Sequence, residues 1–224
     1  KEQWRYWHDF AQNNLFGIEI NDSIARVAKM NMIIHDDGHT NVIGFDALND
    51  IEKMTAKNPG FARNRFDFIV TNPPFGATVK RSEHPYLEKF ALAKNGQKIR
   101  DNQKTEILFI ERCIDFLKPE TGKMAIVLPD GVLTNAGTQY VRDFIMERCQ
   151  ILGVVSMPIF AFAHFGAAVK SSLVFVRRKG TKEKLGRYKI FMAIADHIGY
   201  DARGNTEPRN DLPMILEKYQ DFKS

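Results

Sequence analysis

The sequence contains the run FDFIVTNPPFG at residues 66–76. Its first six residues are mostly aromatic or β-branched, which is typical of a buried strand. Pro73 and Pro74 have no N–H to donate to a β-ladder, so this strand has to end before them. The run therefore predicts a strand whose carboxyl end carries the amide of Asn72, with the ring of Phe75 close by.

Apolar runs and helical patterns alternate on both sides of this strand. We expect further strands at 15–20, 41–46, 123–128 and 151–157, and helices after the cap cluster 21–23 and at 106–117 and 138–149. Two β-rich runs, 171–176 and 188–195, are joined by a polar segment and predict a hairpin. Nearly continuous apolar strands separated by helices predict an α/β fold, with a mostly parallel sheet and an antiparallel hairpin at one edge. No composition shift marks a second domain, so we expect one domain over residues 1–224, with a more polar tail from residue 200.

Composition narrows the classes of function. Hydrophobic residues make up 44% of the 224 residues, which excludes a disordered chain. The formal charge of +5 is compatible with a polyanionic partner without demonstrating one. The two cysteines form no CxxC pattern, no apolar run reaches the roughly 20 residues of a membrane span, and the first residues hold no apolar signal-peptide core. His35 and His39 flank two acids, but the glycine between them breaks the helix face that a metal would need, so we expect no metal.

Three of the expected strands end in a polar residue: Glu19, Asp46 and Asn72. The carboxyl ends of strands in an open α/β sheet are where ligands bind, and an acid there can accept hydrogen bonds from ribose hydroxyls. A strand-end Glu is more often a capping or solvated residue, and this alternative stays open. The Asn72 amide oxygen and the Pro73 carbonyl form two rigid acceptors suited to an exocyclic amino group, beside the aromatic Phe75. The alternative is a Pro-Pro turn that only leaves the strand.

The segment 77–104 is long and predicted to be irregular. It holds seven basic and three acidic residues, so most of the net charge lies beside the candidate site. Such a segment could contact phosphates, or it could be a solvated loop. Phe160, Phe162 and Phe165 form an aromatic cluster near a strand end, and such clusters more often belong to a core than to a base-stacking site.

Taken together, these runs resemble the N6-adenine DNA methyltransferases. The matching motifs are GIEIN at 17–21, GFDAL at 44–48 and the run at 66–76. Further matches, in the same order as in the modification subunit of type I restriction–modification systems, are EILFIE at 106–111, LKP at 117–119, GKMAIVLPDGVL at 122–133 and VKSSL at 169–173. The resemblance covers residues 15 to about 178, and the ordered series is far more specific than the NPPF motif alone.

The resemblance implies a class I fold that uses S-adenosylmethionine, and it implies roles for particular residues. The cofactor would be bound by Glu19, Ile20, Asp46, Ala47 and Asn72. The catalytic motif would be Asn72, Pro73, Pro74 and Phe75, with Phe75 stacking on the flipped target adenine and Phe165 or Phe162 covering its other face. DNA phosphates would be contacted by Lys80, Arg81, Lys98 and Arg100.

The partners that the resemblance implies are double-stranded DNA, from which an adenine is extruded, and the specificity and restriction subunits of a type I complex, in the cytoplasm of a prokaryote. The family's first motif, a glycine-containing turn after the first strand, has no match in this sequence. We therefore expect an N-terminally truncated domain with an empty slot between the strands ending at Glu19 and Asn72, weak cofactor binding and self-association. Two alternatives remain: a protein glutamine N5-methyltransferase, against which Phe75 in place of Tyr argues, and a non-catalytic remnant that binds DNA or partner subunits.

Overall fold

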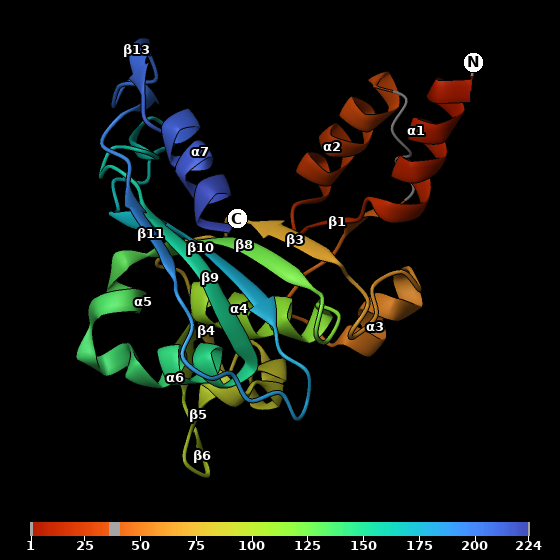
Figure 1. Ribbon diagram of the computed structural model, residues 1–224. Helices are drawn as coiled ribbons and strands as arrows, with labels where there is room; N and C mark the ends of the chain where they lie inside the picture. The colour runs from red at the N-terminus through yellow and green to blue at the C-terminus, as the bar shows by residue number, and fades with distance from the viewer. Residues whose placement is uncertain (1, 36–40, 224) are drawn as a thin grey trace. The chain divides into compact units, whose positions relative to one another are not determined.

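The computed structural model describes residues 2–35 and 41–223 (Figure 1). The chain forms two compact units, 1–65 and 66–224, and each is described by itself. The prediction of a single domain over the whole chain stays a prediction. Within the described residues, no helix is long and apolar enough to cross a membrane.

The first unit contains a two-stranded parallel sheet with its helices. Its elements are α1 (Glu2–Asn14), β1 (Gly17–Glu19), α2 (Asp22–Ile34), β2 (Val42–Gly44) and α3 (Ile51–Lys57). Asn21 caps α2, because its side-chain oxygen accepts from the backbone N–H groups of Ser23 and Ile24. The pairing of Glu19 with Gly44 brings the ends of both strands to the same edge. The strands and helix predicted around residues 15–46 are therefore confirmed.

The second unit is built on a five-stranded sheet in the order β11-β9-β10-β8-β3. Its main elements are β3 (Phe68–Thr71), α4 (Thr105–Phe116), β8 (Lys123–Pro129), α5 (Asp130–Thr134), α6 (Gln139–Arg148), β9 (Cys149–Ser156), β10 (Ser171–Arg178) and β11 (Phe191–Ile194), with 3-10 turns at Ala136–Thr138 and Ala163–Phe165. Strand β3 lies at one edge and pairs with β8 in parallel. Among the described residues, β1 and β3 each have one strand partner, and the predicted slot between them stays a prediction.

The predicted hairpin between 171–176 and 188–195 is wrong. Strand β10 lies inside the sheet, antiparallel to both β8 and β9, whereas β11 pairs with β9 in parallel at the far edge. The physical reason is that β10 is apolar on both faces: Val174 and Val176 pack into one core, and Leu173 and Phe175 pack against the other. A strand of this kind is stabilised by neighbours on both sides rather than by an edge position.

Helices α4 and α6 cover one face of this sheet, and the C-terminal helix α7 (Leu212–Lys223) packs on the other (Figure 1). On the first face, Ile110 of α4 and Leu128 of β8 are fully buried. Cys113 and Cys149 are buried in the same core, and desolvation raises the pKa of each thiol to about 12. Before α7, the tail forms an antiparallel pair of β12 (Ile198–Tyr200) and β13 (Thr206–Asn210).

The basic segment 77–104 is not irregular, contrary to the prediction. It contains β4 (Thr78–Lys80) paired with β7 (Asn102–Lys104), β5 (Lys94–Asn95) paired with β6 (Lys98–Ile99), and 3-10 helices at Pro85–Lys89 and Ala91–Ala93. Leu87, Phe90 and Leu92 are buried within it. These elements span only two to five residues each, which is too short for a helical or strand periodicity to be recognised in the sequence. We call this segment the insert.

An ion pair fixes the connection that leaves β10. Arg177 donates to both carboxylate oxygens of Glu183, at 2.5 and 3.1 Å, and to the carbonyl of Glu120. The backbone N–H of Gly180 donates to the same carboxylate. These hydrogen bonds, with that of Arg177 the strongest, lower the pKa of Glu183 from 4.5 to about 2.

This pair predicts a pH-dependent contribution to stability. Because the pKa of Glu183 is lower in the folded protein, its contribution is present above pH 4.5 and is lost as the pH falls towards about 2. We expect Glu183→Gln to melt below the wild type at pH 7 and the two melting curves to converge below pH 4. The control is Glu207→Gln on exposed β13. A melting difference that stays constant from pH 7 to pH 3 would contradict the prediction.

Candidate functional site

The carboxyl end of β3 presents the motif that the sequence singled out. The last strand residue, Thr71, pairs with Ile126 of β8, and the chain then leaves the sheet at Asn72. Asn72 is exposed and Pro73 is buried, so the proline anchors the turn while the amide faces outwards. Gly76 has a φ of +76°, which a residue with a Cβ rarely adopts, and it turns the chain into the insert. The predicted placement of the Asn72 amide at a strand end is confirmed.

Two aromatic rings from distant parts of the chain meet beside this motif. The rings of Phe75 and Phe162 lie 6.5 Å apart between centroids at an angle of 81°, an edge contact. Phe165, the first choice from the sequence, is 75% exposed, and its ring lies 3.8 Å from that of His164. Of the two residues named for the second face of the base, Phe162 is therefore the one that lies against Phe75.

The two predicted cofactor acids lie at one edge of the first unit. Glu19 ends β1, and one of its carboxylate oxygens accepts from the N–H of Asn21 at 2.8 Å. Asp46 follows β2 by two residues, and its carboxylate accepts from the N–H of Leu48 at 2.9 Å. A carboxylate has two oxygens and about four acceptor positions, so the Glu19 carboxylate keeps capacity for ligand hydroxyl groups. Ile20 is 70% exposed beside Glu19, and Ala47 is partly exposed after Asp46.

The four basic residues predicted to contact DNA have different environments. Lys80 and Arg81 form ion pairs with acids of the insert, Glu83 at 3.0 Å and Glu88 at 2.6 Å. Arg100 lies over the ring of Tyr140, with 4.7 Å between its guanidinium carbon and the ring centroid. Lys98 is exposed in the β5–β6 hairpin and forms no ion pair with any residue that the structure describes, and the same is true of Lys94. The β5–β6 hairpin therefore presents two positive charges, on Lys94 and Lys98, that no described acid neutralises.

A buried acid attaches the insert to the rest of its unit. The two carboxylate oxygens of Glu111 on α4 accept from the backbone N–H groups of Ala91 and Leu92, both at 2.7 Å. Burial raises the pKa of this carboxyl group, although the two backbone hydrogen bonds oppose that shift. Gln103 adds a second link, because its side-chain amide donates to the carbonyl of Leu92 and to the hydroxyl of Tyr140. The insert is therefore held by specific polar contacts as well as by its own apolar residues.

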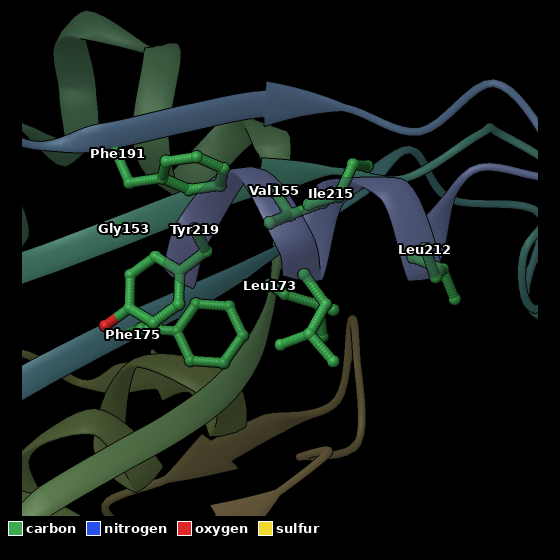
Figure 2. A pocket seen from close by; sticks show the side chains of 9 residues that line it. Gly153, Val155, Leu173, Phe175, Phe191, Leu212, Ile215 and Tyr219 are labelled. Atoms are coloured by element: carbon green, nitrogen blue, oxygen red, sulfur yellow. The ribbon is translucent and has the colours of Figure 1, made fainter. Parts of the chain in front are cut away.

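A cavity of about 240 Å³ lies elsewhere, between α7 and the face formed by β9, β10 and β11 (Figure 2). Val155 and Leu173 line it from the sheet, Phe191 lines it from β11, and Ile215 and Tyr219 line it from α7. Its lining is almost wholly apolar and contains none of the strand-end acceptors. Tyr219 carries the one polar side-chain group among its lining residues, so the cavity is a poor candidate for chemistry on a polar substrate.

The segment around His35 and His39 falls largely outside the described residues, which omit 36–40. Over 2–35 and 41–223, no group of three acids, histidines or cysteines is placed to hold a metal ion. Sequence reasoning also left Asp130, Lys170 and Tyr200 without a role, although Asp130 and Lys170 lie inside the matched motifs at 122–133 and 169–173. The antiparallel register brings these two motifs together, with Ser172 opposite Leu128.

Comparison with known proteins gives one consistent result. The sequence model described as N-6 DNA methylase matches residues 3–223. The chain is 26% identical over 179 residues to the type I restriction enzyme EcoEI methylase subunit of Escherichia coli, covering 79% of this chain and 33% of that protein. It is 26% identical over 211 residues to the MpnII methylase subunit of Mycoplasma pneumoniae, covering 93% of this chain and 38% of that protein. The chain thus spans 33% and 38% of the lengths of these two relatives.

Solved structures show the same fold. A type I restriction-modification methyltransferase subunit from Streptococcus thermophilus aligns over 94% of this chain and 42% of its own, with a TM-score of 0.68 and 24% identity. A putative class I S-adenosylmethionine-dependent methyltransferase from Listeria monocytogenes aligns over 94% of this chain and 56% of its own, with a TM-score of 0.63 and 16% identity. The predicted class I methyltransferase fold is confirmed.

The attachment of the insert predicts the effect of removing the buried acid. Glu111→Ala leaves the buried N–H of Leu92 without an acceptor, at a cost of about 1–3 kcal/mol, and removes the acceptor of the partly buried N–H of Ala91 as well. We expect amide hydrogen exchange, measured by mass spectrometry, to accelerate in peptides that contain Ala91 and Leu92 while peptides of β8 and β10 stay protected. Glu147→Ala on the exposed face of α6 is the control. Unchanged exchange in the insert would show that the apolar contacts alone hold it.

Proposed function

The chain belongs to the N-6 DNA methylase family, and from this premise we propose that it forms the catalytic part of an enzyme that methylates the N6 amino group of adenine in DNA. The observation that carries the proposal is the end of β3. There the exposed Asn72 amide, the Pro73 carbonyl and the ring of Phe75 follow a strand in fixed order. Two acceptors and a stacking face are what an aminopurine requires of a binding site.

The chemistry of the amino group explains the choice of neutral acceptors. The nitrogen lone pair of adenine is delocalised into the ring, which makes it a weak nucleophile. When the Asn72 amide oxygen and the Pro73 carbonyl accept hydrogen bonds from its two N–H groups, the nitrogen can become pyramidal, and its lone pair then loses conjugation with the ring and becomes available. When bound, S-adenosylmethionine would supply an electrophilic methyl group, whose bond to sulfur breaks as the bond to the amino nitrogen forms, leaving a neutral thioether. Positioning therefore carries the transfer, and the surplus proton leaves the nitrogen for solvent.

The aromatic pair supports the handling of an extruded base. The target amino group is inaccessible within a stacked duplex, so the adenine has to leave the helix before it can react. Phe75 offers a ring for stacking directly after the acceptors, and its edge contact with Phe162 restricts its orientation. Phe165 is exposed nearby in the chain and is available to a neighbouring nucleotide.

The first unit supplies residues that fit the cofactor. The Glu19 carboxylate can accept from both ribose hydroxyls, since one of its oxygens is engaged only with the N–H of Asn21. The exposed Ile20 side chain can pack on the adenine ring, and Asp46 with Ala47 can meet its amino edge. Asn72 is the further cofactor contact that we propose, because the reacting methyl group has to lie beside the amino group that Asn72 binds.

The relatives support a class of substrate and a set of partners. The curated relatives named above are methylase subunits of type I restriction enzymes, which supports DNA rather than a protein glutamine as the substrate. We propose that the protein acts in the prokaryotic cytoplasm on double-stranded DNA together with a specificity subunit, which reads the sequence, and a restriction subunit. The intact catalytic motif supports an active enzyme over a non-catalytic remnant.

Removing the amide tests the catalytic role. Asn72→Ala deletes one of the two acceptors, and we expect methyl transfer to unmethylated DNA to fall by about a hundredfold or more. Because Asn72 is exposed, the melting temperature should stay close to that of the wild type. The assay uses tritiated S-adenosylmethionine, with Asn31→Ala on the exposed side of α2 as the control. If lost folding accounts for the lost rate, Asn72 is only a turn residue.

The hairpin lysines test the contact with DNA. Replacing Lys94 and Lys98 together by Gln removes two exposed charges that no acid neutralises. If each meets one phosphate, the slope of log Kobs against log salt concentration should decrease by about two. Lys182→Gln with Lys184→Gln, in the connection after β10, is the matched control. An unchanged slope would remove the hairpin from the interface.

A further inference from the structure

The connection between β9 and β10 carries Phe162 and has a defined shape. We call residues 157–170 the aromatic loop. Its two ends lie side by side, because β9 and β10 are antiparallel and Ser156 is opposite Ser172. At its tip, the N–H groups of Phe165 and Ala167 both donate to the carbonyl of Phe162. The loop therefore holds Phe162 at the start of a tight turn.

A lysine joins the two ends of this loop. The ammonium group of Lys170 donates to the hydroxyl of Ser156 at 2.7 Å and to the carbonyl of Met157. The N–H of Met157 donates in turn to the carbonyl of Ser171 at 3.0 Å. Lys170 is partly buried, and it forms no ion pair with any carboxylate that the structure describes. A charged donor that satisfies neutral acceptors here gives a strong and directional link.

The same neck is tied to the strand that pairs with β3. The N–H of Asp130, at the end of β8, donates to the carbonyl of Lys170 at 2.9 Å. The Ser172 hydroxyl donates to the Asp130 carboxylate at 2.8 Å. Because β8 also pairs with β3, these bonds connect the neck of the loop with the sheet edge where Asn72 and Phe75 lie.

The loop is also held near its tip. The Tyr200 hydroxyl donates to the carbonyl of Ala161 at 2.9 Å, directly before Phe162, and Ala161 is buried. The Tyr200 ring makes an edge contact with His164 at 5.1 Å between centroids. Tyr200 lies in β12, so the polar tail of the chain supports the loop from outside the five-stranded sheet.

We propose that Lys170 and Tyr200 are positioning residues: they clasp the aromatic loop at its neck and near its tip, and so hold Phe162 against Phe75, where the target adenine stacks. Both act through the backbone of the loop, which sets the place of the Phe162 ring. The proposal deepens the proposed function and rests on it for the identity of the base.

The clasp itself is tested without DNA. Chymotrypsin cuts after the loop residues Phe160, Phe162 and Phe165 when the loop opens, and mass spectrometry identifies these cuts. Loss of a charged hydrogen-bonding group should raise the open population, so we expect Lys170→Met to be cut about tenfold faster than wild type and Tyr200→Phe a few-fold faster. Lys170→Arg keeps donors for both acceptors and should restore protection. Lys182→Met and Tyr188→Phe are the matched controls.

The connection to the chemistry is tested in the same variants with tritiated S-adenosylmethionine and unmethylated plasmid DNA. We expect Lys170→Met to lower kcat about tenfold with little change in KM for the cofactor, and Lys170→Arg to recover most of it. Phe162→Ala is the reference, because a residue that acts only through Phe162 adds nothing once that ring is gone. Lys170→Met combined with Phe162→Ala should therefore be no slower than Phe162→Ala alone.

The outcomes separate the two proposals. Wild-type protection of the loop in Lys170→Met and Tyr200→Phe would overturn the clasp. Faster cutting with unchanged kcat, or effects that add fully to Phe162→Ala, would overturn its role in positioning the ring. If the wild type, assembled with its specificity subunit, transfers no methyl group to DNA while the cutting rates change as expected, the proposed function fails and the clasp of the loop stands.

Discussion

A proline has no N–H to give to a neighbouring strand, and the pair at Pro73 and Pro74 determines where β3 ends. The residue before the pair is thereby presented at the sheet edge, with its amide outside the ladder. The positive φ of Gly76 then turns the chain away into the insert, so the strand end is left open to a ligand. Everything proposed about the site depends on this forced termination, because a strand that continued could engage the carbonyl at position 73 in the ladder instead of leaving it to a ligand.

The antiparallel strand β10 brings the remaining parts of the second unit to the same place. Strand β10 pairs with β8 and β9 at once and is antiparallel to both, so the ends of β8 and β9 both lie beside the beginning of β10. The connection that starts at the end of β9 therefore returns next to Asp130 and has to stay near the edge of β3. The motifs at 122–133 and 169–173 lie some forty residues apart in the sequence, and the antiparallel register places Asp130 beside Ser172. Local sequence does not reveal this contact.

The elements with an extended local pattern could be predicted from the sequence. The prediction failed where the elements are short or where the choice of strand partner determines the arrangement. The strands around Glu19, Phe68 and Leu128 and the helix through Ile110 were predictable, because each has a local run or periodic pattern of apolar residues in the sequence. The pairing of β10 was not, since two β-rich runs joined by a polar segment have the same local pattern whether or not they form a hairpin. The insert was missed because its elements span two to five residues each. Spacing alone also could not choose between Phe162 and Phe165, which depends on how the loop turns.

The burial of both cysteines has a practical consequence for chemical labelling. Thiol reagents attack the thiolate, and the thiols of Cys113 and Cys149 are solvent-shielded, with pKa values near 12. The native protein therefore offers maleimide dyes almost no target at neutral pH. A single cysteine introduced on an exposed residue would take up a fluorophore or spin label selectively, with the natural pair left in place. Distances inside the folded protein could then be followed without first changing the residues of its core.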